Sequence, residues 1–256
     1  MPYDTIRRGV KRPNPLGTAI FVGLRSFDPF IQYNILANGL GSGLLAKVGL
    51  EQLPAGLATN TGTIIDKLGL SPYRLILLSM SVGSALKHIF WLLTVSEEGF
   101  EPKSAIAVGL YNTFCNSIND LLFTSSIASA SLASGQSFPQ WPLIVGSLSY
   151  VIGITTETVA ELQRKRFKKN NPGKPYTGGL WSLARHINYT GYALWRAGYT
   201  CAGGGFGAGL VMLIFTLVDF DRRSIVTLDK YCTDRYGAQW EDFKKKTPYK
   251  LIPYVY

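Results

Sequence analysis

Carboxylates and basic side chains recur at helical spacing after residue 156. Four of them are separated by four, four and three residues and would share one face of a helix: Glu157, Glu161, Lys165 and Lys168. At a membrane boundary, carboxylates followed by cations can hold a polar ligand. The same spacing also fits a solvated, positively charged end of a membrane helix, so both interpretations remain open.

A second group of polar side chains falls within eight positions and follows Gly178 and Gly179. Its members are Arg185, His186, Asn188, Tyr189 and Tyr192. Arginine and histidine suit a phosphate, asparagine suits an amide or a ribose, and tyrosine offers stacking or a hydroxyl contact. This segment is therefore a candidate nucleotide site, with contact to lipid headgroups as the alternative.

An acid could be supplied from the middle of the chain. Asp120 lies in a stretch otherwise free of charge. Burying a carboxylate there costs free energy unless it is paired with another group or in contact with water. We expect Asp120 and His88 to act together on the substrate, with Tyr111 beside them. The three asparagines at spacings of four and three are predicted to contact the substrate: Asn112, Asn116 and Asn119. Hydrogen bonding between helices is the alternative for these three.

Neither a metal nor a nucleic acid is expected as a partner. The three cysteines, Cys115, Cys201 and Cys232, are scattered, and the two histidines, His88 and His186, are far apart, so no zinc spacing occurs. The basic excess is concentrated near the end of the chain, where we interpret it as a signal of membrane topology.

Composition indicates the elements that must position these residues. Of 256 residues, 46% are hydrophobic and only 16% are charged, against about 25% in a typical soluble domain. No charge occurs in three stretches: 104–119, 121–156 and 197–218. We predict an all-α, polytopic bundle of transmembrane helices, and the alternative is a large soluble helical domain. The sequence thus implies a lipid bilayer and a hydrophobic small molecule as partners.

Hydropathy and Lys/Arg placement predict six or seven spans and a cytosolic carboxyl-terminal tail. Residues 16–58 form one or two apolar segments, in which Arg25 and Asp28 are expected to be paired or to face a cavity. The later predicted helices cover residues 72–95, 104–133, 143–163, 179–200 and 203–220.

Three motifs carry a resemblance to a known superfamily. The segment ARHINYTGY at 184–192 resembles the RHxNYxG(D/E) element of the steroid 5α-reductases and sterol reductases. The tail from Asp229 to Tyr256 resembles the carboxyl end of the sterol reductases. Residues 150–169 are similar to the cofactor-side helix of uncharacterised membrane reductases in the same superfamily.

The resemblance implies a seven-helix bundle, located in the endoplasmic reticulum membrane, that binds NADPH through its carboxyl-terminal helices. We divide the chain into three regions: a basic leader at 1–15, substrate-side helices at 16–150, and a nucleotide side at 151–256. Carried over by position, the cofactor contacts are Glu157, Glu161, Arg185, His186, Asn188, Tyr189, Arg222, Arg223 and Tyr236.

The expected activity is NADPH-dependent reduction of an activated C=C bond in a sterol-, steroid- or terpenoid-like substrate. Two departures fall on cofactor positions: Tyr192 replaces an acidic residue, and Thr227 and Leu228 replace an Arg-Asp pair. A redox-neutral isomerase or cyclase is therefore one alternative. An isoprenylcysteine-type methyltransferase is another, although Ile187 replaces the proline of its RHPxYxG element. The last alternative is a lipid-binding protein without enzymatic activity.

Overall fold

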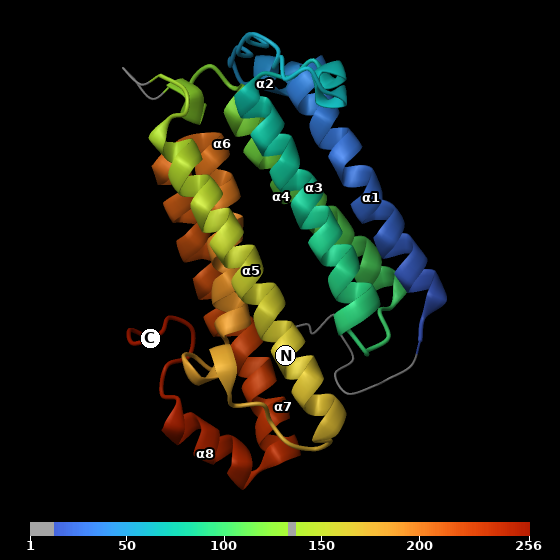
Figure 1. Cartoon of the computed structure of the whole chain (residues 1–256), viewed down its shortest axis with the longest axis vertical. Coiled ribbons are helices and arrows are strands. Elements are labelled where there is room, and N and C mark those ends of the chain that lie inside the picture. The colour runs from blue at the N-terminus through green and yellow to red at the C-terminus, as the bar shows by residue number, and fades with distance from the viewer. Residues whose placement is uncertain (1–12, 133–136) are drawn as a thin grey trace.

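The computed structural model describes residues 13–132 and 137–256, and these form helices without a β-strand (Figure 1). A single bridge joins Gln52 to Ser125. The long helices are α1 (Pro15–Asn38), α3 (Pro72–Phe90), α4 (Pro102–Thr124), α5 (Trp141–Asn170) and α6 (Ile187–Asp219). The shorter helices are α2 (Ser42–Lys47), α7 (Val226–Tyr236) and α8 (Ala238–Lys246), with 3-10 turns at Ile64–Leu68, Ala130–Leu132 and Gly179–Ser182.

Local sequence explains several helix boundaries. Pro72, Pro102 and Pro142 lie in the first turns of α3, α4 and α5, where a missing backbone N–H costs nothing. Residues 16–58 contain one long helix, α1, and the six-residue α2. Of the predicted leader, residues 1–12 lie outside the described residues. The helix predicted over 143–163 continues to Asn170, because lysines and arginines are favourable near a helix carboxyl end.

Helix α6 is a hairpin rather than a single rod. Gly205 adopts φ 82° and ψ 178°, which interrupts the helix, and only glycine adopts this conformation without strain. After the reversal, Gly209 lies against Cys201, and the ring of Phe220 stacks on Tyr189 with a centroid distance of 4.4 Å. The two arms therefore run antiparallel. Two separate helices were expected here, but the first begins at Ile187 rather than at residue 179, and the break falls at Gly205 rather than between 200 and 203.

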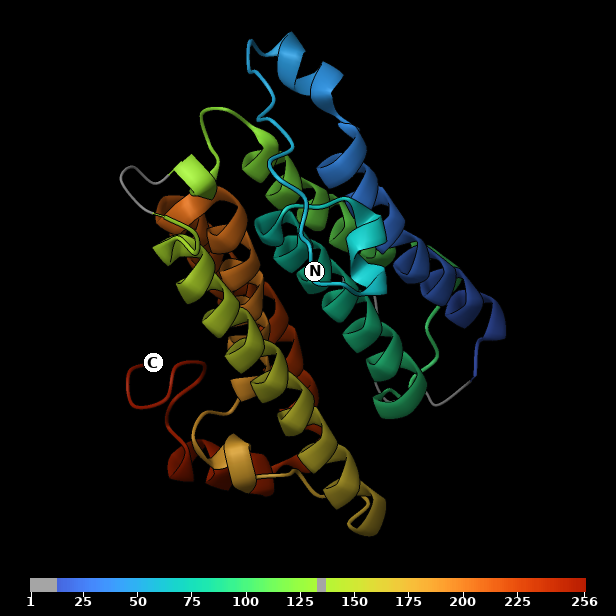
Figure 2. The ribbon, with the colours of Figure 1, turned by 45° about the horizontal axis from the view of Figure 1, so that its top comes forward.

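The long helices form two groups (Figures 1 and 2). Helix α1 packs on both α3 and α4, α5 packs along α6, and α4 also contacts α6. Two π-helical segments extend long helices at their carboxyl ends: Trp91–Val95 after α3 and Phe220–Ile225 after α6. Such segments are frequent at functional sites.

Besides an apolar core, the bundle buries several charged and amide side chains and exposes many large apolar ones, unlike a typical soluble domain. Arg25, Asp28, Asn116 and Arg196 are fully buried. Large apolar side chains project outward from the long helices: Phe27, Phe30, Leu86, Leu93, Leu110, Phe114, Leu148, Val151, Phe206, Leu210, Val211 and Phe215. This pattern disfavours a soluble helical domain and fits a lipid environment.

Three helical segments among the described residues are long and apolar enough to cross a membrane: Pro72–Val95, Trp141–Asn170 and Ile187–Tyr236. The third segment includes the reversal at Gly205, so it contains both arms of α6. The protein thus has the helices of an integral membrane protein.

Helices α5 and α6 touch backbone to backbone. A Cβ on Gly146 would lie 2.6 Å from the carbonyl oxygen of Gly198, and one on Gly153 would lie 2.4 Å from the amide nitrogen of Trp195. A Cβ on Gly191 would likewise lie 2.6 Å from the amide nitrogen of Glu157. We call these four glycines, Gly146, Gly153, Gly191 and Gly198, the glycine seam. Small residues allow membrane helices this close approach.

The substitution Gly198→Ala should therefore destabilise the bundle. Its Cβ would lie 2.6 Å from two backbone atoms on α5, which cannot move like a flexible side chain. We expect a loss of about 1–3 kcal/mol, as for other overpacked sites, measured as a lower melting temperature of the purified protein. Gly23→Ala is the control, because no atom lies within 4 Å of its added Cβ. Equal melting temperatures for the two variants would contradict the close contact.

Candidate active site

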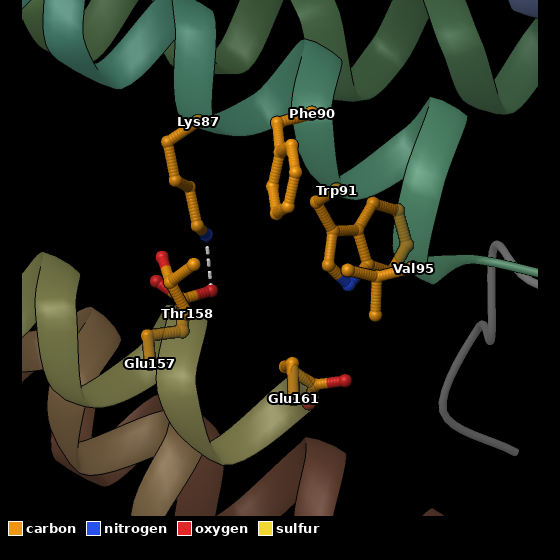
Figure 3. A pocket seen from close by; sticks show the side chains of 7 residues that line it. All are labelled: Lys87, Phe90, Trp91, Val95, Glu157, Thr158 and Glu161. Carbon is orange, nitrogen blue, oxygen red and sulfur yellow. Dashed lines mark hydrogen bonds and ion pairs between the residues drawn. The ribbon is translucent and has the colours of Figure 1, made fainter. Parts of the chain in front are cut away.

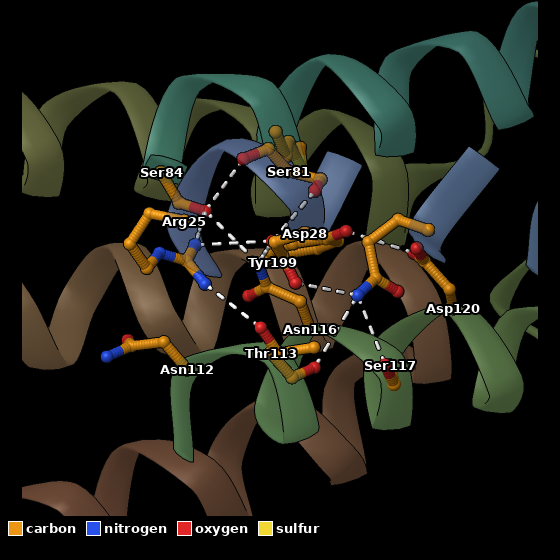
Figure 4. A network of polar contacts seen from close by, with 12 residues as sticks. Arg25, Asp28, Ser81, Ser84, Asn112, Thr113, Asn116, Ser117, Asp120 and Tyr199 are labelled. Carbon is orange, nitrogen blue, oxygen red and sulfur yellow. Dashed lines mark hydrogen bonds and ion pairs between the residues drawn. The ribbon is translucent and has the colours of Figure 1, made fainter. Parts of the chain in front are cut away.

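A buried polar network joins α1, α3 and α4 (Figure 4). Its centre is Asp28, which accepts from Arg25 at 3.2 Å and from Asn116 at 2.8 Å. Gln32 and Ser81 donate to the same carboxylate at 2.9 and 3.2 Å. The predicted pairing of Arg25 and Asp28 is confirmed, and both side chains are fully buried.

Arg196 extends this network to α6. Its guanidinium donates to the side-chain oxygens of Asn112 and Asn116, and to the hydroxyl of Tyr192 at 3.0 Å. It also lies 4.3 Å from the centroid of the Trp195 ring. No carboxylate of the described residues forms an ion pair with Arg196, and its Nε has no partner there. A fully buried guanidinium is thus held by neutral oxygens and aromatic rings.

The three predicted asparagines all face the interior, where protein partners occupy them. Asn112 and Asn116 accept from Arg196, and Asn119 accepts from the hydroxyl of Thr200 at 2.8 Å. They act in this structure as hydrogen-bonding links between helices. Their contact with a substrate remains a prediction.

Asp120 and His88 contact different residues. One oxygen of Asp120 accepts from the hydroxyl of Tyr199 at 3.0 Å, and the other has no partner among the described residues. His88 lies instead against the rings of Phe21 and Trp195, with centroid distances of 6.4 and 5.8 Å. Tyr111 is 45% exposed. The structure therefore does not bring the three predicted catalytic residues together.

A narrow slot separates the end of α3 from α5 (Figure 3). It is lined by Lys87, Phe90, Trp91, Val95, Glu157, Thr158 and Glu161, and it is too narrow in this structure to admit a water molecule. Lys87 forms an ion pair with Glu157 across the slot. The other oxygen of Glu157 accepts from the indole of Trp195 at 2.7 Å. Trp195 thus connects the slot to Arg196 and the buried network.

Glu161 connects the slot to the predicted nucleotide motif. It accepts from the amide nitrogen of Asn188 at 2.8 Å and forms an ion pair with Arg164. The side-chain oxygen of Asn188 is buried and has no hydrogen-bond partner among the described residues. Two of the predicted cofactor residues therefore lie together at the slot, and one keeps an unused acceptor.

The remaining motif residues hold the carboxyl-terminal tail. Arg185 donates to the carbonyl oxygens of Thr247 and Pro248 at 2.6 and 2.9 Å, and His186 stacks on Tyr189. Burial lowers the pKa of His186 to about 3, and the neighbouring charge of Arg185 adds to this effect. His186 is therefore neutral at physiological pH.

The cofactor residues predicted after α6 are more peripheral. Arg222 and Arg223 are exposed, and Arg223 pairs with Asp219. The hydroxyl of Tyr236 accepts from Lys168 at 3.0 Å. No group of three or more metal-ligating side chains occurs among the residues that the structure describes.

Sequence reasoning missed Lys87, Trp195 and Arg196. Both cations are isolated in apolar segments, and Arg196 directly precedes 22 residues without charge, 197–218. An ionisable residue inside a membrane segment is a functional candidate for that reason alone. The isolated charges of Lys87 and Arg196 could therefore have identified both residues from the sequence.

Removing the carboxylate of Asp28 should unfold or strongly destabilise the bundle. Asp28→Ala would leave the buried guanidinium of Arg25 without its counter-ion, and such losses cost about 3–5 kcal/mol. Asp219→Ala is the control, because its pair with Arg223 is partly exposed to solvent and should contribute at most about 1 kcal/mol. Thermal melting of the purified variants measures both. A similar change for the two variants would refute the central role of Asp28.

Stability should fall as the pH decreases below 6.5, because the unfolded chain protonates His186 while the folded chain does not. The folded pKa is lowered to about 3, so this contribution is complete above pH 6.5 and is lost toward pH 3. Between pH 7 and pH 5 the loss is about 2 kcal/mol. Melting curves at both pH values should show a smaller pH dependence for His186→Gln than for the unchanged protein. An equal dependence would contradict this assignment.

Comparison with known proteins places the chain in a family. Residues 111–247 match the family described as "Protein of unknown function (DUF1295)". The chain is 44% identical over 243 residues to the probable O-methyltransferase ustE of Ustilaginoidea virens, covering 92% of this chain and 86% of that protein.

Sterol reductases are also similar over shorter stretches. The Delta(14)-sterol reductase ERG24 of Candida albicans is 34% identical over 96 residues, which are 36% of this chain and 20% of that protein. The Delta(14)-sterol reductase TM7SF2 of Mus musculus is 29% identical over 126 residues, 41% of this chain and 29% of that protein. The chain spans less than a third of these two reductases. It belongs to the DUF1295 family, within the steroid 5α-reductase and sterol reductase-like superfamily of membrane proteins.

Proposed function

We propose that the protein is a membrane reductase that uses NADPH to reduce an activated C=C bond in a lipid-soluble substrate. The similarity to sterol reductases supports this reaction class. The substrate would be sterol-, steroid- or terpenoid-like and would reach its site from the lipid.

The observation that carries this proposal is the excess of cations beside the slot. Glu157 and Glu161 are each paired with a cation. Among the described residues, Lys165 and Lys168 instead bond to a backbone carbonyl and a tyrosine hydroxyl and form no ion pair. Residues 161–256 contain sixteen lysines and arginines against seven acidic residues. Such a surface attracts a multiply charged anion such as NADPH. S-adenosylmethionine carries one carboxylate and a cationic sulfonium, so it gains less from this charge.

The residues present fit a nicotinamide nucleotide. The unused oxygen of Asn188 can accept from a carboxamide, and Glu161 holds the side chain in place. Arg164, Lys165 and Lys168 can contact phosphate. When bound, the reduced nicotinamide would supply a hydride. The ion pair of Lys87 and Glu157 then lies between the proposed nicotinamide site and the buried network.

The arrangement of the helices supports six crossings. The start of α1 and the end of α3 line one cavity, and Lys165 near the end of α5 bonds to the carbonyl of Thr94. These three ends therefore lie at the same end of the bundle. If the basic residues 164–169 are cytosolic, the leader and the tail are cytosolic too. An endoplasmic reticulum location is part of the proposal.

O-methyl transfer is the second candidate, because the 44% identical relative that covers most of the chain is named a probable O-methyltransferase. If the protein is a methyltransferase, S-adenosylmethionine would bind beside Glu161 and Asn188, at one end of the slot. A carboxylate and an amide at that place suit its ribose hydroxyls and amino group.

The change in melting temperature on adding each cofactor to the protein in lipid nanodiscs distinguishes reduction from methyl transfer. NADPH at 100 times its dissociation constant should stabilise the protein by about 2.7 kcal/mol, and S-adenosylmethionine should have no effect. Asn188→Ala should weaken NADPH binding, while Asn38→Ala, an exposed position on α1, should not. Stabilisation by S-adenosylmethionine alone would overturn the reductase proposal in favour of methyl transfer.

A further inference from the structure

A groove of about 570 Å³ lies between the start of α1 and the end of α3. Two adjacent carboxylates, Glu97 and Glu98, lie along it, and no lysine or arginine lines it among the residues that the structure describes. Its wall includes four apolar side chains: Val22, Leu92, Leu93 and Phe100. We call this space the acidic groove. It combines negative charge with an apolar surface, so it suits a partner that is basic and partly apolar.

The walls of the acidic groove are packed against each other. A Cβ on Gly17, in the first turn of α1, would overlap the carbonyl oxygen of Phe100. The rings of Phe21 and Phe100 meet edge to face with a centroid distance of 5.1 Å. The start of α1 therefore directly contacts the segment that connects α3 to α4, and the acidic groove is built by close contacts.

The chain enters α1 at the edge of the acidic groove. The side chain of Asn14 caps the helix by accepting from the amide of Gly17 at 3.0 Å. Asn14 also lines the groove, together with Pro13 and Pro15. The twelve residues that precede Pro13 are therefore attached at the edge of the groove, whichever way they run from there.

Residues 1–12 have the composition that the acidic groove suits. They contain one aspartate and four cations: Arg7, Arg8, Lys11 and Arg12. Apolar side chains lie between these charges: Tyr3, Ile6 and Val10. A short tether of this kind holds a segment beside its binding site at an effective concentration on the order of 1 mM. Ion pairs that are individually weak at a surface can then keep the segment bound.

We propose that residues 1–12 bind in the acidic groove of their own chain. Their cations pair with Glu97 and Glu98, and their apolar side chains cover Leu92 and Leu93. Two adjacent carboxylates repel each other, and cations beside them relieve this repulsion. The surface of a membrane with anionic lipids offers negative charge as well, but it lacks a fixed apolar wall next to the point where the segment is attached.

Binding in the acidic groove acts on the end of α3. The π-helical segment Trp91–Val95 separates the groove from the slot. Leu92 and Leu93 line the groove, whereas Trp91 and Val95 line the slot. A segment held in the groove therefore supports one wall of the slot from behind. This contact goes beyond the proposed reaction and does not depend on which cofactor the protein uses.

Disulfide crosslinking of the full chain in nanodiscs of zwitterionic lipid tests the contact. One new cysteine replaces Gly9, and the other replaces Ser96, which lines the acidic groove. The three native cysteines are buried. Gly9→Cys with Ser96→Cys should form a disulfide at least about tenfold faster than Gly9→Cys with Lys47→Cys. The reason is that Lys47 lies beyond the opposite end of α1.

Charge reversal distinguishes a bound segment from one that is only tethered nearby. In the groove cysteine pair, Glu97→Lys with Glu98→Lys should slow crosslinking at least about fivefold, the effect of one strong surface ion pair. Arg7→Glu with Arg8→Glu should slow it similarly, and the four changes together should restore the rate. Glu51→Lys, at an exposed glutamate outside the groove, is the control and should leave the rate unchanged.

The same measurement in nanodiscs with anionic lipid distinguishes the acidic groove from the membrane surface. Equal rates in the two kinds of nanodisc would support binding in the groove. Three results would overturn the proposal: crosslinking no faster than in the control cysteine pair, a rate that charge reversal does not lower, or a lowered rate that the combined reversal does not restore. Loss of crosslinking in anionic lipid would also overturn it and would assign residues 1–12 to the membrane surface.

Discussion

The close contact between α5 and the first arm of α6 determines the rest of the site. The glycine seam lets the two backbones approach to distances that exclude a Cβ. Consequently Glu157 meets Trp195, and Glu161 meets Asn188, across neighbouring helices. A wider separation would break both bonds at once and leave two carboxylates inside the bundle with a single partner each.

A lipid-facing exterior places a second constraint on the interior. Lipid cannot solvate polar groups, so side chains such as Asp28 and Arg196 must find partners inside the bundle. Asp28 finds them on three helices, whereas Arg196 contacts neutral oxygens and rings and no carboxylate among the described residues. These hydrogen bonds join α1, α3, α4 and α6 inside the bundle.

Much of the architecture follows from sequence because it depends on local signals. Proline at helix starts, apolar length, and the glycines before residue 206 predicted α3 and the two arms of α6. The position of Arg25 and Asp28 inside an apolar segment predicted that they pair or face a cavity, and they form a pair. The contact of Lys87 with Glu157 joins residues 70 positions apart, and no local period encodes it. For the same reason Arg185, expected to meet phosphate, contacts the carbonyl oxygens of a tail more than 60 residues away.

The central claim is that the cofactor binds where Glu161 and Asn188 meet the slot. Photo-crosslinking with a nicotinamide nucleotide analogue, followed by mass spectrometric mapping of the labelled peptides, tests it most directly. The account predicts labels within residues 157–168 and 185–192, and competition by unlabelled NADPH. Labels confined to α1 and α4, or labelling that excess NADPH does not reduce, would contradict it.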